Sequence, residues 1–175
     1  MRTRNRAVLV IGAAALLALA GLAAWAGRNS AEAPALDPEH RSILFVCRNG
    51  VAMSVWSALT FDRLAAERGL AIRAASRAST PSFTEVPLRM RLALALDGFR
   101  IGDYRPRVIS ADDVRGAERV IVIDTELPPE ASAPGAAIET WAGFPPMRER
   151  YFASRAALRT RVEELVARLA ASRSR

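Results

Sequence analysis

A run of four apolar residues, Ile43-Leu44-Phe45-Val46, constrains the fold of this chain more than any other feature. The run is short and lacks polar alternation, which is typical of a strand buried on both faces of a sheet. It ends at Cys47, and a helical pattern of apolar residues begins a few positions later. A strand with two buried faces needs covering layers on both sides, so the sequence predicts an α/β architecture.

Strand and helix patterns alternate along the rest of the chain. The first helical pattern begins at Ser54, a residue type that caps helices, and stops at Gly69. Such alternation predicts a parallel sheet covered on both faces, in one domain over residues 42–172. The other predicted elements are a strand at 71–75, a helix from Thr84 to Gly98, a short helix capped by Ser110 and Asp113, strands at 120–123 and 137–140, and a last amphipathic helix through Leu158, Val162, Leu165, Val166 and Leu169.

The place of Cys47, directly after the first strand, favours a functional site. A loop from a strand into a helix aims backbone N–H groups at one point, and the helix dipole adds positive charge there. Such a loop binds phosphate-like anions and favours the thiolate form of a nearby cysteine, which is then a nucleophile. Ser54 is predicted to donate a hydrogen bond to that thiolate. From placement alone, an inert buried cysteine is an equal alternative.

The stretch from Ile43 to Ser54 resembles the first loop of the low-molecular-weight protein tyrosine phosphatases and of their arsenate-reductase relatives. That family carries a cysteine, five residues, an arginine and a serine directly after its first strand. The likeness continues through residues 64–69 and 104–107, the strand ending at Asp124, and Trp141 with the final helix. It therefore covers nearly all of residues 42–169.

The resemblance implies a three-layer α/β/α fold with a four-stranded parallel sheet. It also implies a phosphocysteine intermediate on Cys47, with Ser54 as the second catalytic residue. The substrate would be a phosphorylated protein or a small phosphate ester, and no cofactor is implied. The oxyanion-binding loop would consist of Arg48, Asn49, Gly50, Val51, Ala52 and Met53.

Two departures from the family pattern bear on activity. Met53 stands where the family has its loop arginine, and a thioether neither clamps phosphoryl oxygens nor stabilises their charge. The Gly-Asn pair of the family loop is reversed here, as Asn49-Gly50. Residues 144–147, where the family has its general-acid aspartate before a proline, contain no carboxylate. Glu139 and Glu149 lie nearby in sequence, and both are predicted to be solvated surface residues.

Two functions therefore stay open. The first is a weak cysteine-dependent phosphatase in which Arg48, or an arginine from another loop, replaces the missing charge. The second is an inactive pseudo-phosphatase that binds an oxyanion or a protein. An arsenate reductase with an internal cysteine relay is disfavoured, because Cys47 is the only cysteine.

The N-terminus has the pattern of a membrane segment. Arg2, Arg4 and Arg6 precede an uncharged stretch over residues 7–26, which at about 1.5 Å per residue reaches roughly 30 Å as a helix. We predict a signal anchor in residues 1–26 and a linker in 27–41, with the domain facing the periplasm or exterior of a bacterial-type inner membrane. The alternative is a signal peptide cleaved near Ala24-Trp25-Ala26, which would release the domain.

The charge and the histidine content of the chain predict no further binding partner. The formal net charge is +7 and all 25 basic residues are arginine, but no arginine run is interleaved with aromatic residues. Nucleic-acid binding is therefore not predicted. A metal site is not predicted either, because the only histidine, His40, lies in the linker.

Overall fold

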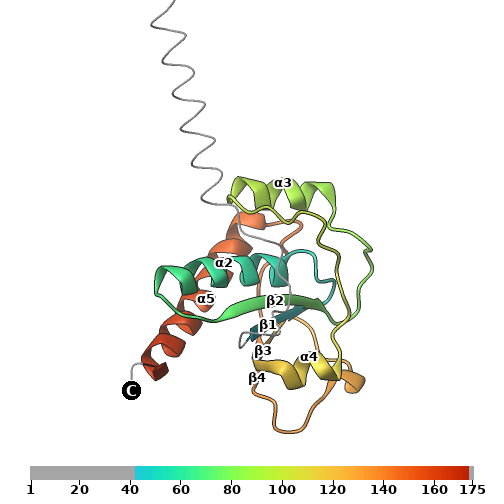
Figure 1. Ribbon diagram of the computed structural model, residues 1–175. Helices are drawn as coiled ribbons and strands as arrows, with labels where there is room; N and C mark the ends of the chain where they lie inside the picture. The colour runs from blue at the N-terminus through green and yellow to red at the C-terminus, as the bar shows by residue number, and fades with distance from the viewer. Residues whose placement is uncertain (1–41, 174–175) are drawn as a thin grey trace, which may run out of the picture. The chain divides into compact units, whose positions relative to one another are not determined.

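A computed structural model describes residues 42–173, and a four-stranded parallel sheet forms the centre of this part (Figure 1). The strands are β1 (Ser42–Cys47), β2 (Arg73–Ala78), β3 (Ala117–Ile123) and β4 (Ile138–Trp141), in the spatial order β2-β1-β3-β4. Every neighbouring pair is parallel. The predicted α/β architecture and four-stranded parallel sheet are confirmed.

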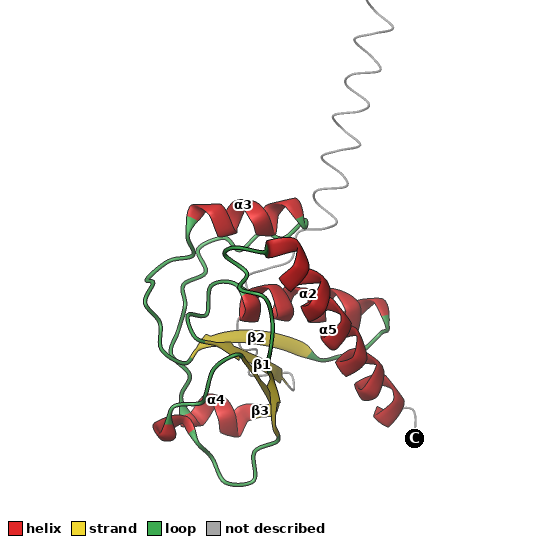
Figure 2. Ribbon diagram, turned by 180° about the vertical axis from the view of Figure 1, so that it is seen from behind, coloured by secondary structure: helices red, strands yellow, loops and turns green. Residues whose placement is uncertain are grey.

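The helices form two layers around this sheet (Figure 2). One layer contains α2 (Met53–Glu67) and α5 (Tyr151–Arg173), with α3 (Leu88–Leu96) beside them, and the other contains α4 (Ala111–Gly116) and the short 3₁₀ helix η1 (Pro129–Ala131). Side chains of alternate residues of β1 pack against the two helix layers. Ile43 and Phe45 belong to the core under α2 and α5, whereas Leu44 and Val46 belong to the core with Val114 of α4.

The predicted signal anchor or signal peptide in residues 1–26 and the predicted linker in 27–41 lie outside the described residues. Among the helices of residues 42–173, none combines the length and the apolar character that a membrane span needs.

Several predicted boundaries are wrong, and the strand predicted at 120–123 begins at Ala117, three residues earlier. The helix expected from Thr84 begins at Leu88, because Pro87 stands at its N-cap position and a residue before proline is disfavoured in helical conformation. The second strand runs from Arg73 to Ala78 instead of from 71 to 75. Its last residues include Ser76 and Arg77, which are buried although their polar side chains suggest a loop.

The burial of Arg77 is compensated by one carboxylate. Its guanidinium donates to Asp113 of α4 twice, from Nε at 3.1 Å and from Nη2 at 2.9 Å, and it is only 3% exposed. Asp113 also forms the predicted capping box with Ser110, whose hydroxyl accepts from the Asp113 N–H. The Asp113 carboxylate thus caps the N-terminus of α4 and also joins this helix to β2.

A half-buried carboxylate, Asp62 of α2, predicts a pH dependence of stability. Its Oδ1 accepts from the Ala74 N–H at 2.7 Å, but burial outweighs this bond and raises its pKa from 3.8 to about 6. The carboxylate therefore destabilises the folded chain above pH 6, and this cost disappears as the pH falls below 4. We expect Asp62→Asn to stabilise the domain by about 2 kcal/mol at pH 7.5 and hardly at all at pH 4, measured by urea unfolding.

The matched control for this prediction is Glu67→Gln, because Glu67 is an exposed carboxylate on the same helix. It should change the free energy of unfolding by less than about 0.5 kcal/mol at both pH values. Equal effects of Asp62→Asn at pH 4 and pH 7.5 would contradict the assignment.

Candidate functional site

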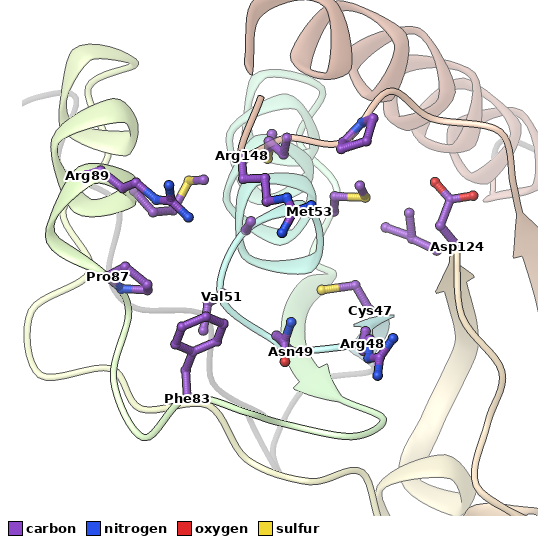
Figure 3. A pocket seen from close by; sticks show the side chains of 15 residues that line it. Cys47, Arg48, Asn49, Val51, Met53, Phe83, Pro87, Arg89, Asp124 and Arg148 are labelled. Carbon is purple, nitrogen blue, oxygen red and sulfur yellow. The ribbon is translucent and has the colours of Figure 1, made fainter. Parts of the chain in front are cut away.

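The loop between β1 and α2 lies at the carboxyl end of the sheet and forms one wall of a pocket of about 260 Å³ (Figure 3). The sulfur of Cys47 points into this pocket, and Cys47 as a whole is 7% exposed. Gly50 and Ser54 are buried and do not line the pocket. The predicted site residues that do line it are Cys47, Arg48, Asn49, Val51, Ala52 and Met53.

Ser54 contacts the cysteine and does not cap the helix. Helix α2 begins one residue earlier than predicted, at Met53, and its N-cap residue, Ala52, makes no side-chain cap. Ser54 therefore stands inside the first turn, with its Oγ 3.0 Å from the Cys47 Sγ. Ser76 of β2 donates to the same Ser54 Oγ at 2.9 Å, which leaves the Ser54 proton free to point at the sulfur.

A tyrosine extends this hydrogen-bonded chain. The Tyr104 hydroxyl lies 3.1 Å from the Ser76 Oγ and 2.9 Å from the Gly50 carbonyl oxygen, and it can donate to either. Burial, more than any other factor, raises the pKa of Tyr104 above its ordinary value of 10.0, so it stays a donor at neutral pH. When Tyr104 donates to Ser76, the order Tyr104, Ser76, Ser54, Cys47 aims successive O–H groups at the sulfur.

The segment that follows β2 holds the backbone of the loop. Ser79 N–H donates to the Cys47 carbonyl at 3.0 Å, and Thr80 N–H donates to the Arg48 carbonyl at 2.8 Å. The Asn49 Oδ1 accepts from the Ser82 N–H at 2.9 Å. These three bonds fix the first half of the loop and explain the position of Asn49 at the edge of the pocket.

Position 50 requires a positive φ and leaves no space for a Cβ atom, and only glycine meets both requirements. Its φ is +64°, and a Cβ there would lie 3.0 Å from the Ala78 Cβ and 3.1 Å from the Ala78 backbone nitrogen. We expect Gly50→Ala to cost about 3 kcal/mol of folding free energy, from the left-handed backbone and the contact with β2 together. The control is Gly135→Ala, at φ +77° in open space, which should cost only about 1 kcal/mol in the same urea unfolding assay. Equal costs would show that β2 yields to the new methyl group.

Two arginines from outside the loop between β1 and α2 bring positive charge to the pocket. Met53 brings a thioether to the pocket wall, in the place where the family resemblance leads one to expect arginine. Arg89 of α3 and Arg148 before α5 also line the pocket, and Figure 3 shows their guanidinium groups directed into it, with Arg48 on the other side of Cys47. Sequence reasoning did not single out Arg89 or Arg148, because nothing distinguishes them among the 25 basic residues.

Asp124, at the end of β3, is the only carboxylate among the described residues that line the pocket. It has a φ of +45°, and its two oxygens accept from the Gly143 N–H at 2.7 Å and the Phe144 N–H at 3.0 Å. These bonds fix the segment that leads to Pro146 and Met147. Asp124 is therefore placed to hold this pocket wall, whereas the sequence indicates only the end of a strand there.

The two glutamates near this segment in sequence do not line the pocket. Glu139 was predicted to be solvated, and this is wrong: it is half-buried, accepts from the Trp141 indole at 2.7 Å and pairs with Arg168 at 3.0 Å. Glu149 is exposed, as predicted, and pairs with Arg148 at 2.9 Å. Neither carboxylate is placed to act on a group bound at Cys47.

Comparison with solved structures identifies the fold. The chain resembles the thioredoxin-dependent arsenate reductase of Corynebacterium glutamicum (21% identity, TM-score 0.59, 76% of this chain and 63% of that one). It also resembles a protein tyrosine phosphatase from Entamoeba histolytica (15% identity, TM-score 0.63, 76% and 99%) and an arsenate reductase from Archaeoglobus fulgidus (21% identity, TM-score 0.57, 71% and 98%).

The chain thus has the fold of the low-molecular-weight tyrosine phosphatases and arsenate reductases, as the resemblance implied. It spans 63% of the length of the Corynebacterium enzyme. No protein-family model and no curated protein sequence matches it.

Proposed function

We propose that this protein hydrolyses phosphate monoesters slowly, with Cys47 as the nucleophile. The observation that carries the proposal is the contact of the Cys47 Sγ with the Ser54 Oγ, at 3.0 Å, in a pocket where a strand leads into a helix. The likeness to phosphatase structures supports the same chemistry. A phosphorylated protein or a small phosphate ester is the substrate class.

The reaction proceeds in two displacements. The Cys47 thiolate attacks phosphorus, the S–P bond forms, and the P–O bond to the alcohol or phenol breaks. The leaving oxygen takes a proton from water, because the only carboxylate that lines the described pocket, Asp124, is hydrogen-bonded to two backbone N–H groups. Water then attacks phosphorus, the S–P bond breaks, and inorganic phosphate leaves with the thiolate regenerated.

The guanidinium groups of Arg89 and Arg148 compensate in part for the missing loop arginine. Both line the pocket and both are exposed, so they attract a dianionic ester without clamping it in a fixed geometry. The site lacks a loop arginine that binds two phosphoryl oxygens and a positioned general acid. We therefore expect turnover at least about a hundredfold below that of a phosphatase site that has both groups.

An assay of the full chain on an aryl phosphate, beside Cys47→Ser, tests the proposal. Steady release of phenol that depends on Cys47 would support it, as would a burst of one phenol per chain that reports the phosphocysteine. Gly135→Ala serves as a control for folding, because that glycine does not line the pocket. Turnover equal to that of Cys47→Ser would end the proposal.

A second candidate is a pseudo-phosphatase that binds an oxyanion or a protein without turnover. Met53 in the loop and the hydrogen-bonded carboxylate of Asp124 favour it, since both parts that speed such a reaction are missing. Binding of tungstate without any Cys47-dependent hydrolysis would support this alternative.

We also propose that the domain works at a bacterial-type inner membrane, facing the periplasm or exterior, or free there after cleavage of a signal peptide. Arg2, Arg4 and Arg6 before the uncharged residues 7–26 support this location. Recovery of the full-length chain in carbonate-washed membranes would favour the anchor. A shortened chain in the periplasmic fraction would favour the signal peptide, and a cytosolic chain would contradict both.

A further inference from the structure

The most exposed large apolar side chains of residues 42–173 gather on α3 and at the start of α5. Leu96 is 81% exposed, Leu88 71%, Phe152 70% and Leu92 59%. The three leucines are spaced by four residues, so they form one stripe along α3, which we call the leucine face. Single exposed apolar residues are ordinary, but a contiguous stripe marks a surface that contacts an apolar partner.

The opposite side of α3 is apolar as well. Met90 and Leu94 of this helix are buried in the core under α2 and α5. Figures 1 and 2 show α3 outermost in its layer, with α2 and α5 on its inner side. A helix that is apolar all round is typical of a helix with an apolar environment on both sides. The core provides one of them, and within residues 42–173 the leucine face has no cover.

The start of α5 continues this surface. The Tyr151 hydroxyl donates to the Ala93 carbonyl of α3 at 3.1 Å, which joins the first turn of α5 to α3. Phe152 is the next residue, and its ring packs edge to face on the Tyr151 ring, with the centroids 5.7 Å apart. An exposed aromatic side chain therefore stands on the helix that is bonded to α3.

The charge around the leucine face is positive. Helix α3 contains two arginines, Arg89 and Arg91, and no acidic residue. The two flanking carboxylates, Glu85 and Asp97, each pair with an arginine from outside α3, so they do not neutralise the arginines of this helix. Arg100 follows the helix and is exposed. An apolar stripe edged by arginine matches a surface that is apolar inside and anionic outside.

We propose that the leucine face and Phe152 rest on the surface of an anionic phospholipid bilayer. The apolar side chains enter the boundary between headgroups and acyl chains, and the arginines beside them bind lipid phosphates. This inference rests on the proposed location at the membrane and is independent of the phosphatase function.

The length of chain before the domain allows this contact. Fifteen residues, 27–41, separate the proposed anchor from β1, and fifteen residues reach at most about 50 Å. A domain of this size has a radius of gyration of about 14 Å, so any of its faces can reach the bilayer and the apolar face is the one that stays there. The tether also raises the effective concentration of the domain at the surface, so a small apolar stripe is sufficient.

A second copy of the chain is the alternative occupant of the leucine face. Pairing of two α3 helices would bring their arginines together without a carboxylate on either helix to compensate. Like charges in contact disfavour such a pair, whereas anionic headgroups attract the same arginines.

The test places a fluorescent bimane label at Ala95, an exposed residue of α3, through Cys47→Ser with Ala95→Cys in the full-length chain. The chain is reconstituted in vesicles of phosphatidylcholine with about 30% phosphatidylglycerol, some of it carrying a nitroxide quencher near the headgroup. We expect quenching at least about fivefold stronger than for a label at Asp112→Cys, since Asp112 is 88% exposed on α4 in the other helix layer. Vesicles of phosphatidylcholine alone should reduce the quenching about fivefold.

Charged substitutions test the leucine face directly. Leu92→Glu or Leu96→Glu, added to the chain labelled at position 95, should weaken the quenching at least about fivefold. The matched control is Val108→Glu, which changes an apolar side chain that is 52% exposed outside α3 and α5. It should leave the quenching unchanged, and circular dichroism shows whether each variant is folded.

Two results would overturn the proposal. The first is equal quenching at the two labelled positions in a chain that carbonate does not remove from the vesicles; the membrane location would then stand without the docking. The second is a blue-shifted label at position 95 that lipid does not quench, because a second copy or another segment of the chain would then cover the leucine face. Strong quenching in a chain that carbonate does remove would contradict the anchor and support the docking.

Discussion

Replacing Met53 by arginine should raise kcat/KM for an aryl phosphate about a hundredfold, the largest functional gain that we expect from one substitution. Met53 is the first residue of α2 and lines the pocket beside Cys47. A guanidinium there would bind two phosphoryl oxygens at once and would stabilise the charge that develops on them. A gain of this size corresponds to about 3 kcal/mol of transition-state stabilisation.

Two variants separate this effect from a change in packing. Met53→Leu keeps the position neutral and should leave hydrolysis near the parent rate. In the double variant Cys47→Ser, Met53→Arg, tungstate should bind more tightly than in Cys47→Ser alone, and hydrolysis should be absent. Arginine at the start of a helix costs about 0.5 kcal/mol against the helix dipole, so a small loss of stability is expected. An arginine variant that is folded and no faster than the parent would show that the loop differs from the phosphatase geometry.

Replacing Asp113 by alanine should destabilise the domain by about 3–5 kcal/mol, the largest loss of stability that we expect from a surface-accessible position. The substitution leaves the Arg77 guanidinium, which is 3% exposed, without its carboxylate, although one bond to the Ser76 carbonyl remains. It also removes the capping box of α4. Urea unfolding at pH 7 measures the effect.

The neighbouring residue provides the control. Asp112 is 88% exposed and pairs with Arg115 on the surface of the same helix, so Asp112→Ala should cost less than about 1 kcal/mol. If both substitutions lowered the free energy of unfolding by a similar amount, the pair of Arg77 and Asp113 would contribute no more to stability than an exposed ion pair.

The Asp113 effect should depend on pH. Burial alone would raise the pKa of Asp113, but the hydrogen bonds and the charge of Arg77 outweigh it and hold the pKa below 3.8. The pair therefore contributes its full stability above the ordinary pKa of aspartate and loses it as the pH falls through the lower folded value. The difference in stability between the parent and Asp113→Ala should narrow below pH 3.8 and stay constant from pH 5 to 7. A difference that is unchanged at pH 2.5 would contradict this account.

The sequence predicts those parts of the fold whose signals are local. The run from Ile43 to Val46 is buried on both faces as expected, because four apolar residues in a row have no other place in a small domain. The capping box of Ser110 and Asp113 and the stop at Gly69, with its φ of +66°, depend on backbone geometry within one turn. The Cys47 loop could be located for the same reason, since a strand, a loop and a helix follow one another directly.

Features that depend on distant parts of the chain could not be predicted. Ser54 looks like a helix cap until Ser76 of β2 is placed beside it. Arg89 and Arg148 become part of the site only because α3 and the segment before α5 meet over the loop. The polar residues at the end of β2 look like a loop in the sequence. Arg77 can be buried there because it pairs with the Asp113 carboxylate, which lies 36 positions later in the chain. Sequence patterns report what a residue prefers, and these residues take positions that their partners determine.

The position of β1 in the middle of an all-parallel sheet has a consequence for how the chain folds. Ser42 pairs with Arg73 on one side and with Ala117 on the other, so neither neighbour forms by a local hairpin. Pairings of high sequence separation form slowly, and a chain made from its N-terminus must extend past β3 before the sheet can close. The bonds that hold the Cys47 loop come from Ser79 and Thr80, which follow β2, so the loop is held in place only after β2 has joined β1. Until that pairing has formed, the Cys47 sulfur is open to oxidants, so the redox state of the surroundings affects how this protein folds.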